Sequence, residues 1–111
     1  MKKILKYKLP INGGREVIRC GLGRWLEVQP QNGWPHVWVM TDDNAPQIDY
    51  EIISVGTGWE LPDTFSEGNY LGTAQDSAGF VWHYFVQLAD IQQRDEEQYL
   101  IDNWLAEILG M

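Results

Sequence analysis

Residues able to hold a metal ion are few and lie far apart in the sequence. The borderline or soft ligands are Cys20, His36 and His83, which follow no ligand spacing, so we expect each histidine to be a structural side chain. Asp42 and Asp43 could bind a hard cation, but their stretch lacks the alternating Asp pattern and distant Glu of a calcium loop. We therefore expect a solvated turn there, and no metal or other cofactor.

Nucleophiles and acid–base pairs are equally weak candidates. Arg19 and Arg24 flank Cys20 and could lower the pKa of its thiol, but a lone cysteine in a strand is usually a packing residue. Asp49 and Glu51 lie two residues apart, hence on one face of a strand, where they could act as acid and base or simply face water. No catalytic constellation follows from these residues, and we expect that the protein is not an enzyme.

The charges are distributed very unevenly along the 111 residues. Residues 1–24 hold seven of the eight Lys and Arg against one acid, whereas residues 25–111 hold one Arg against fifteen acids. Two interpretations remain open. The basic segment pairs with acidic neighbours in a folded sheet, or the acids form a one-sided surface that attracts basic partners and repels nucleic acid.

Tryptophan beside acidic residues indicates a binding surface. Trp59 falls in a predicted loop with Glu60 and Asp63, and an exposed Trp is a common anchor of protein interfaces. A loop Trp can also plug the end of a sandwich, and the sequence does not separate the two. Since acids in loops can gather on one surface, we expect a partner-binding set of six residues: Trp59, Glu60, Asp63, Glu67, Asp42 and Asp43.

The sequence predicts β-strands along most of the chain, and these strands must position the residues named above. Lys2–Leu9 alternates between apolar and Lys positions, which is typical of a half-buried or edge strand. Asn32-Gly33 predicts a tight type I′ turn joining Trp25–Gln29 to His36–Thr41. Phe80–Val86 is apolar on both faces and predicts a central strand. Further strands are expected at Arg15–Arg19, Gln47–Val55 and Tyr70–Gln75, with a bend at Cys20–Gly23.

The hydrophobic period changes after about residue 90. Ile101, Trp104, Leu105 and Ile108 follow the i, i+3, i+4, i+7 spacing of one helix face, which we expect to be buried in the core or in a dimer interface. The sequence thus predicts one domain over 1–111, a β-hairpin body (1–86) and a C-terminal helix (90–109). The fold class is mainly β (α+β), a small antiparallel sandwich or open barrel of about six or seven strands.

Several segments resemble a family of short phage-encoded proteins of unknown function, over roughly residues 1–85. The resemblance rests on turn and strand residues, so it implies a shared fold rather than a shared chemistry. It also implies a phage or prophage gene expressed in a bacterial cytoplasm. The segments are Ile4–Leu9, Trp25–Met40 with its Val-Gln-x-Gln-Asn-Gly-x-Pro centre, Ile53–Pro62 with Gly-Thr-Gly, Tyr70–Thr73 and Phe80–His83.

These observations favour a binding role. The single cysteine and the absence of a secretory signal or an apolar span predict a cytoplasmic protein. We expect a small acidic protein that inhibits or modulates a host factor, for example in anti-defence, through a surface that imitates nucleic acid. Its partner would be a basic, nucleic-acid-binding host protein, with no direct contact to nucleic acid or membrane. The alternatives are a protein that binds or sequesters a small ligand such as a signalling nucleotide, and a virion accessory protein. Homodimer formation remains open.

Overall fold

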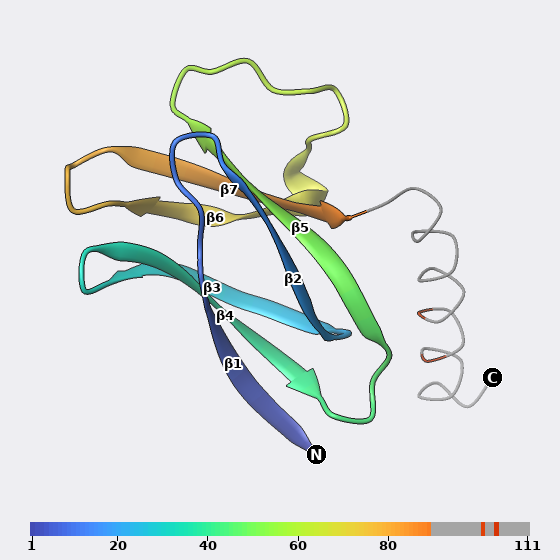
Figure 1. Ribbon diagram of the computed structural model, residues 1–111. Helices are drawn as coiled ribbons and strands as arrows, with labels where there is room; N and C mark the ends of the chain where they lie inside the picture. Colours follow the sequence, from blue (N-terminus) through green and yellow to red (C-terminus); the bar gives the residue numbers. More distant parts are fainter. Residues whose placement is uncertain (90–100, 102–103, 105–111) are drawn as a thin grey trace.

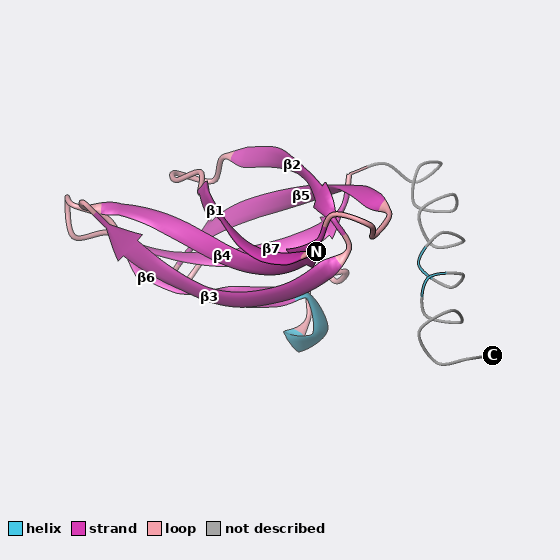
Figure 2. Ribbon diagram, turned by 90° about the horizontal axis from the view of Figure 1, so that it is seen from below, coloured by secondary structure: helices cyan, strands magenta, loops and turns pink. Residues whose placement is uncertain are grey.

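Two antiparallel sheets form the body of the molecule. The computed structural model describes residues 1–89 together with Ile101 and Trp104. The strands in this part are β1 (Lys2–Lys8), β2 (Arg15–Gly21), β3 (Gly23–Gln31), β4 (Trp34–Asp42), β5 (Gln47–Gly56), β6 (Tyr70–Gln75) and β7 (Val81–Leu88), with a 3-10 turn η1 (Glu67–Asn69) before β6. One sheet has the order β1-β4-β3 and the other the order β2-β5-β7-β6, which confirms the expected antiparallel arrangement (Figures 1 and 2). The sheets do not close into a barrel.

The β3–β4 hairpin forms around the predicted turn. Asn32 and Gly33 both have positive φ angles, 53° and 77°, as a type I′ turn requires, and the two strands pair antiparallel on either side. Pro30 lies directly opposite Pro35. This is the second pair from a two-residue turn, where opposite residues exchange no hydrogen bonds, so neither proline removes a bond between these two strands. The hairpin prediction is confirmed.

The main core lies between the two sheets. β7 runs between β5 and β6, as its apolar sequence predicts, and its Trp82 and Tyr84 are buried. The hydroxyl of Tyr84 donates a hydrogen bond to the Pro10 carbonyl over 2.8 Å, which satisfies the one polar atom of a side chain with no exposed surface. The buried cluster comprises Leu9, Ile18, Cys20, Val37, Ile48, Tyr50, Ile52, Trp82 and Tyr84.

A second, smaller apolar cluster lies on the opposite face of the four-stranded sheet. Because side chains alternate along a strand, β5 and β7 send Ile53, Val55 and Phe85 to this outer face. Phe65, from the segment between β5 and β6, stacks on Phe85 with 5.0 Å between ring centroids. The β5–β6 segment is thereby fastened to the sheet.

The predicted helix over 90–109 lies outside the described residues, apart from two of its positions, and stays a prediction. Ile101 packs against the main core, and Trp104 is partly buried beside Lys2 and Arg24. Leu105 and Ile108 are not among the described residues. No described helix is both long and apolar enough to cross a membrane.

Candidate functional site

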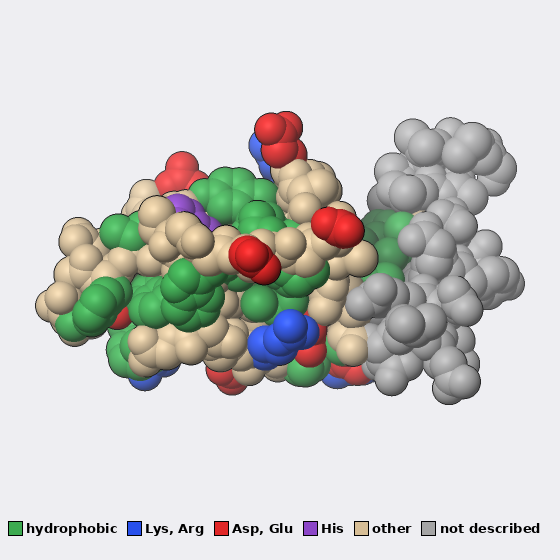
Figure 3. All heavy atoms as spheres, turned by 90° about the horizontal axis from the view of Figure 1, so that it is seen from above, with side chains coloured by type: hydrophobic (Ala, Val, Ile, Leu, Met, Phe, Trp, Pro, Cys, Tyr) green, Lys and Arg blue, Asp and Glu red, His purple; other side chains and the backbone are tan. Residues whose placement is uncertain are grey.

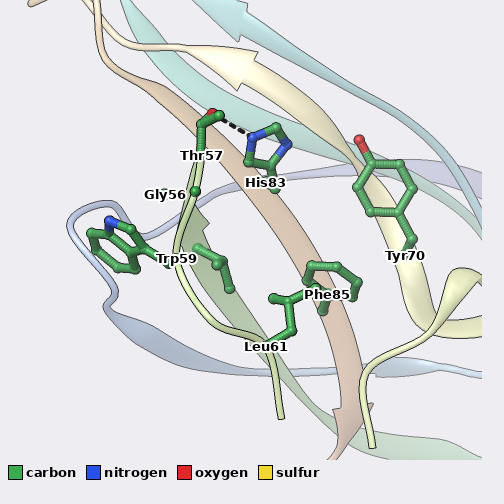
Figure 4. A pocket seen from close by; sticks show the side chains of 9 residues that line it. Gly56, Thr57, Trp59, Leu61, Tyr70, His83 and Phe85 are labelled. Atoms are coloured by element: carbon green, nitrogen blue, oxygen red, sulfur yellow. Dashed lines mark hydrogen bonds between the residues drawn. The ribbon is translucent and has the colours of Figure 1, made fainter. Parts of the chain in front are cut away.

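A hollow of about 280 Å³ opens on the outer face of the four-stranded sheet, and we call it the β5–β6 pocket (Figure 4). Its floor comes from β5 and β7, and its walls come from the chain that follows β5 and from the first residue of β6. The side chains around it are mainly apolar or aromatic, with two polar groups. The lining residues are Val55, Gly56, Thr57, Gly58, Trp59, Leu61, Tyr70, His83 and Phe85.

Gly56 allows Trp59 to form one wall. The Trp59 amide donates to the Gly56 carbonyl over 3.2 Å, and Gly58 between them has a φ of +86°, so the chain turns back sharply. A Cβ on Gly56 would lie 2.5 Å from Cε2 of the Trp59 ring. The ring meets Trp82 edge-on with 5.6 Å between centroids and remains 51% exposed. Trp59 therefore both plugs the end of the sheet and presents an open aromatic surface.

His83 anchors the polar side of the pocket. Its Nε2 lies 2.7 Å from the Thr57 hydroxyl, and its Nδ1 lies 2.9 Å from the Thr73 hydroxyl. The Thr73 hydroxyl also shares a hydrogen bond with the Tyr70 hydroxyl. A hydroxyl can donate to one partner and accept from another, so this chain satisfies the imidazole in either neutral tautomer. With both nitrogens engaged, His83 holds its neighbours in place and is not arranged as a general base.

Exposed acids follow Trp59 along the β5–β6 segment. Glu60, Asp63 and Glu67 are exposed, and none of them makes an ion pair within the described part of the chain. Seen from above the four-stranded sheet, hydrophobic side chains gather on this side of the molecule with acidic side chains next to them (Figure 3). The pocket thus has a mainly apolar lining, and the segment that supplies its wall also carries three exposed acids.

The other two predicted partner-binding acids lie elsewhere. Asp42 and Asp43 precede β5, whereas Trp59 follows it, and ten residues of strand span about 30 Å. Asp42 accepts hydrogen bonds from the Asn44 amide and from the N-terminal amine, and these contacts lower its pKa. Asp43 pairs with Lys3 over 2.5 Å. The six predicted residues therefore form two separate groups. One lies on the β5–β6 segment beside the pocket, and the other, Asp42 and Asp43, lines a smaller hollow of about 150 Å³ at the other end of β5.

Two further ion pairs join the basic second strand to its neighbour. Arg15 binds Glu51 over 3.1 Å, and Arg19 binds Asp49 over 2.9 Å. Asp49 and Glu51 share one strand face as expected, but each faces a guanidinium. They are arranged as ion-pair partners of β2 rather than as an acid–base pair.

Cys20 is a packing residue of the main core. It is buried, and burial raises the pKa of its thiol to about 11, so the thiol stays protonated and a poor nucleophile near neutral pH.

His36 contacts the Trp34 carbonyl through Nδ1 over 2.7 Å. Among the residues placed by the structure, no three His, Cys, Asp or Glu side chains come close enough to hold a metal ion.

Sequence reasoning identified Trp59 but missed most of the pocket. His83 and Phe85 were assigned structural roles, and Tyr70 and Leu61 were not singled out. The usable signal was strand alternation, because it sends His83 and Phe85 to the same face of β7. The Gly-Thr-Gly segment next to Trp59 contributes to the family resemblance, which implies a shared fold and no particular site.

Comparison with known proteins reaches the level of a family. No curated protein and no solved structure matches the chain. Residues 1–95 match a family model that covers all seven strands and the whole β5–β6 pocket, so the chain belongs to the family described as Domain of unknown function (DUF7352).

Proposed function

We propose that this protein is a binding domain that captures a basic segment of a partner protein in the β5–β6 pocket. The observation that carries the proposal is the exposure of the pocket wall. Trp59, Leu61 and Tyr70 are 51%, 46% and 45% exposed, although all three are large and apolar. A partner that covers them removes this surface from water, and Trp and Tyr are the side chains that most often dominate such contacts.

The shape and polarity of the pocket favour a Lys or Arg side chain as the group that enters. Its methylene stem would pack against Leu61 and Phe85, and its cation would lie against the Tyr70 or Trp59 ring. The volume of about 280 Å³ lies just below the range usual for whole small-molecule ligands, about 300–1,000 Å³. One side chain of a larger partner suits this space.

The bordering acids add long-range attraction to the contact. Glu60, Asp63 and Glu67 carry negative charge that no cation of the described chain neutralises through an ion pair. Such charges speed the approach of a basic partner, and salt screens them over about 8–10 Å. The acidic surface in this proposal is confined to the β5–β6 segment, because Asp42 and Asp43 are already paired.

The resemblance to short phage-encoded proteins suggests the biological setting of the proposal. The partner would then be a basic, nucleic-acid-binding factor of a bacterial host, met in the cytoplasm, and binding would inhibit or modulate it, for example in anti-defence. One observation favours a second candidate, a small-ligand binder. The hydroxyls of Thr57, Thr73 and Tyr70 around His83 could hydrogen-bond a polar ligand such as a signalling nucleotide.

Capture of partners from bacterial lysate, followed by affinity measurement at low and high salt, tests the proposal. We expect Leu61→Ala to weaken binding at both salt concentrations, because it removes apolar contact. Glu60→Gln with Asp63→Gln should weaken binding mainly at low salt. Glu16→Gln, an exposed acid on β2, is the matched control and should bind like the wild type. Affinity that ignores salt and all of these substitutions would refute the proposal.

A further inference from the structure

The outer face of the three-stranded sheet carries a row of aromatic rings. Trp34, His36 and Trp38 alternate along β4 with buried residues, so all three point away from the core. Successive rings on one strand face are about 7 Å apart along the strand. The His36 and Trp38 ring centroids are 6.3 Å apart and their planes are tilted by 46°. This row lies on the opposite sheet from the β5–β6 pocket and has no role in the proposed function.

Strand β1 runs beside β4 (Figure 2), and its lysine side chains flank the aromatic row. Lys6 lies directly opposite Trp38 and Lys8 directly opposite His36, and residues directly opposite in an antiparallel pair share a face. The Lys8 ammonium lies 4.1 Å from the centroid of the Trp34 ring. The Lys6 ammonium donates to the Gln31 side chain on β3 over 2.6 Å. Neither lysine pairs with an acid among the residues the structure places.

The cations that the structure places differ in their partners. Lys3, Arg15 and Arg19 make ion pairs with acids. Lys6 and Lys8 do not, and they lie beside aromatic rings instead. The nearest acid across the row is Glu27, opposite Trp38 on β3, where it accepts a 2.6 Å hydrogen bond from Gln29. Positive charge therefore borders the β1 side of the row, whereas the β3 side carries the Glu27 carboxylate beside Trp38 and polar side chains such as Gln29 and Gln31.

We propose that this face binds single-stranded nucleic acid, with bases stacked on Trp38 and His36 and phosphates beside Lys6 and Lys8. Aromatic rings on a sheet next to basic side chains form the arrangement that holds unpaired bases, because every base has a stacking face and every nucleotide carries a phosphate. A duplex does not expose its base faces to such a row. A neutral carbohydrate would leave the two lysines without a role.

The expectation that the protein repels nucleic acid came from the fifteen acids that residues 25–111 hold against one Arg. The fold weakens that argument, because the positive charge left over after ion pairing gathers on one sheet. The remaining acids still repel phosphate at longer range, so we expect weak binding that depends strongly on salt. The inference stands independently of the β5–β6 pocket.

Fluorescence anisotropy with a labelled oligothymidylate tests the inference. We expect binding at low salt, a loss of at least about 5-fold for Trp38→Ala, and retention of most affinity for Trp38→Phe, which keeps a stacking ring. Lys6→Gln with Lys8→Gln should weaken binding and reduce the salt slope by roughly 0.7 for each lost phosphate contact. These two lysines are exposed, so their replacement does not threaten the fold.

Controls separate stacking from simple charge attraction. Lys3→Gln removes a cation from the other face of β1, and Phe80→Ala removes a 62% exposed ring from the turn between β6 and β7; both variants should bind like the wild type. A DNA duplex and heparin, which present negative charge without free base faces, should bind more weakly than the oligothymidylate. No binding at low salt, equal binding of all three polyanions, or wild-type affinity in the Trp38 and lysine variants would overturn the proposal.

Discussion

Replacing Gly56 by Ala tests how the wall of the β5–β6 pocket is held. The new methyl group would lie 2.5 Å from the Trp59 ring, which is closer than carbon atoms can approach. Gly56 does not have a positive φ, so the backbone itself accepts Ala. The substitution therefore acts on Trp59, and we expect the indole to swing out from its place against Trp82.

The cost follows from what the Trp59 ring now buries. Trp59 is 51% exposed, so about half of its surface is covered. A Trp side chain can bury up to about 250 Å², so losing half at about 25 cal/mol per Å² removes about 3 kcal/mol. The edge-on contact with Trp82 adds about 1 kcal/mol. Replacing Gly with Ala lowers the conformational entropy of the unfolded chain, which restores about 0.5–1 kcal/mol of stability. Partial re-burial of the displaced Trp59 ring restores more. We expect a net destabilisation of about 2 kcal/mol.

Urea unfolding followed by far-UV circular dichroism measures this change, and a double-mutant cycle isolates its cause. In a Trp59→Ala background the methyl group on Gly56 meets no ring, so the same substitution should be neutral or slightly stabilising. The coupling between the two positions should be about 2–3 kcal/mol. If Gly56→Ala destabilises both backgrounds equally, the destabilisation does not come from a clash with the Trp59 ring, and the account of the pocket wall is wrong.

Three further substitutions test the rest of the fold. Gly33→Ala should cost about 1–2 kcal/mol in urea unfolding, because φ is +77° there; an unchanged urea midpoint would contradict the turn assignment. Tyr84→Phe should cost about 1–2 kcal/mol, because the half-buried Pro10 carbonyl loses its 2.8 Å donor; no loss would mean that water replaces the hydroxyl. Hydrogen bonding, first from the Trp82 indole, lowers the pKa of Asp76 in the folded state. The stability it contributes is present above about pH 4 and is lost as pH falls toward that lower pKa. Asp76→Asn should therefore unfold with less pH dependence below pH 4 than the wild type, and parallel acid-unfolding curves would contradict this.

Local rules predicted the strands and the main turn, because these depend on neighbouring residues. Alternation placed β1 and β7, and a single dipeptide, Asn32-Gly33, set the hairpin register. The bend expected at Cys20–Gly23 is wrong in extent, since β2 continues to Gly21 and β3 begins at Gly23. A Cβ on Gly21 would lie 2.5 Å from the Thr41 hydroxyl. This glycine serves close approach to a residue twenty positions away, which no local pattern records.

The candidate site was harder to predict for the same reason. The β5–β6 pocket joins β5, β6, β7 and a connecting segment, and its central histidine is defined by hydroxyls 26 and 10 residues away in sequence. Only the strand face of each residue could be inferred beforehand. The separation of Asp43 from Glu60 could not be predicted from local patterns either, because it depends on the ten residues of β5 that lie between them.

The charge asymmetry shows why composition alone does not place charge on the folded surface. A basic start followed by an acidic remainder predicts attraction between the two, and antiparallel pairing of β2 with β5 does place Arg15 and Arg19 beside Glu51 and Asp49. Strand alternation limits that neutralisation, because half of the side chains on any strand face the other way. On β1, Lys3 reaches an acid, whereas Lys6 and Lys8 face the aromatic row of β4. A total charge of −8 is therefore compatible with a basic face, since the strand register and not the sum decides which charges meet.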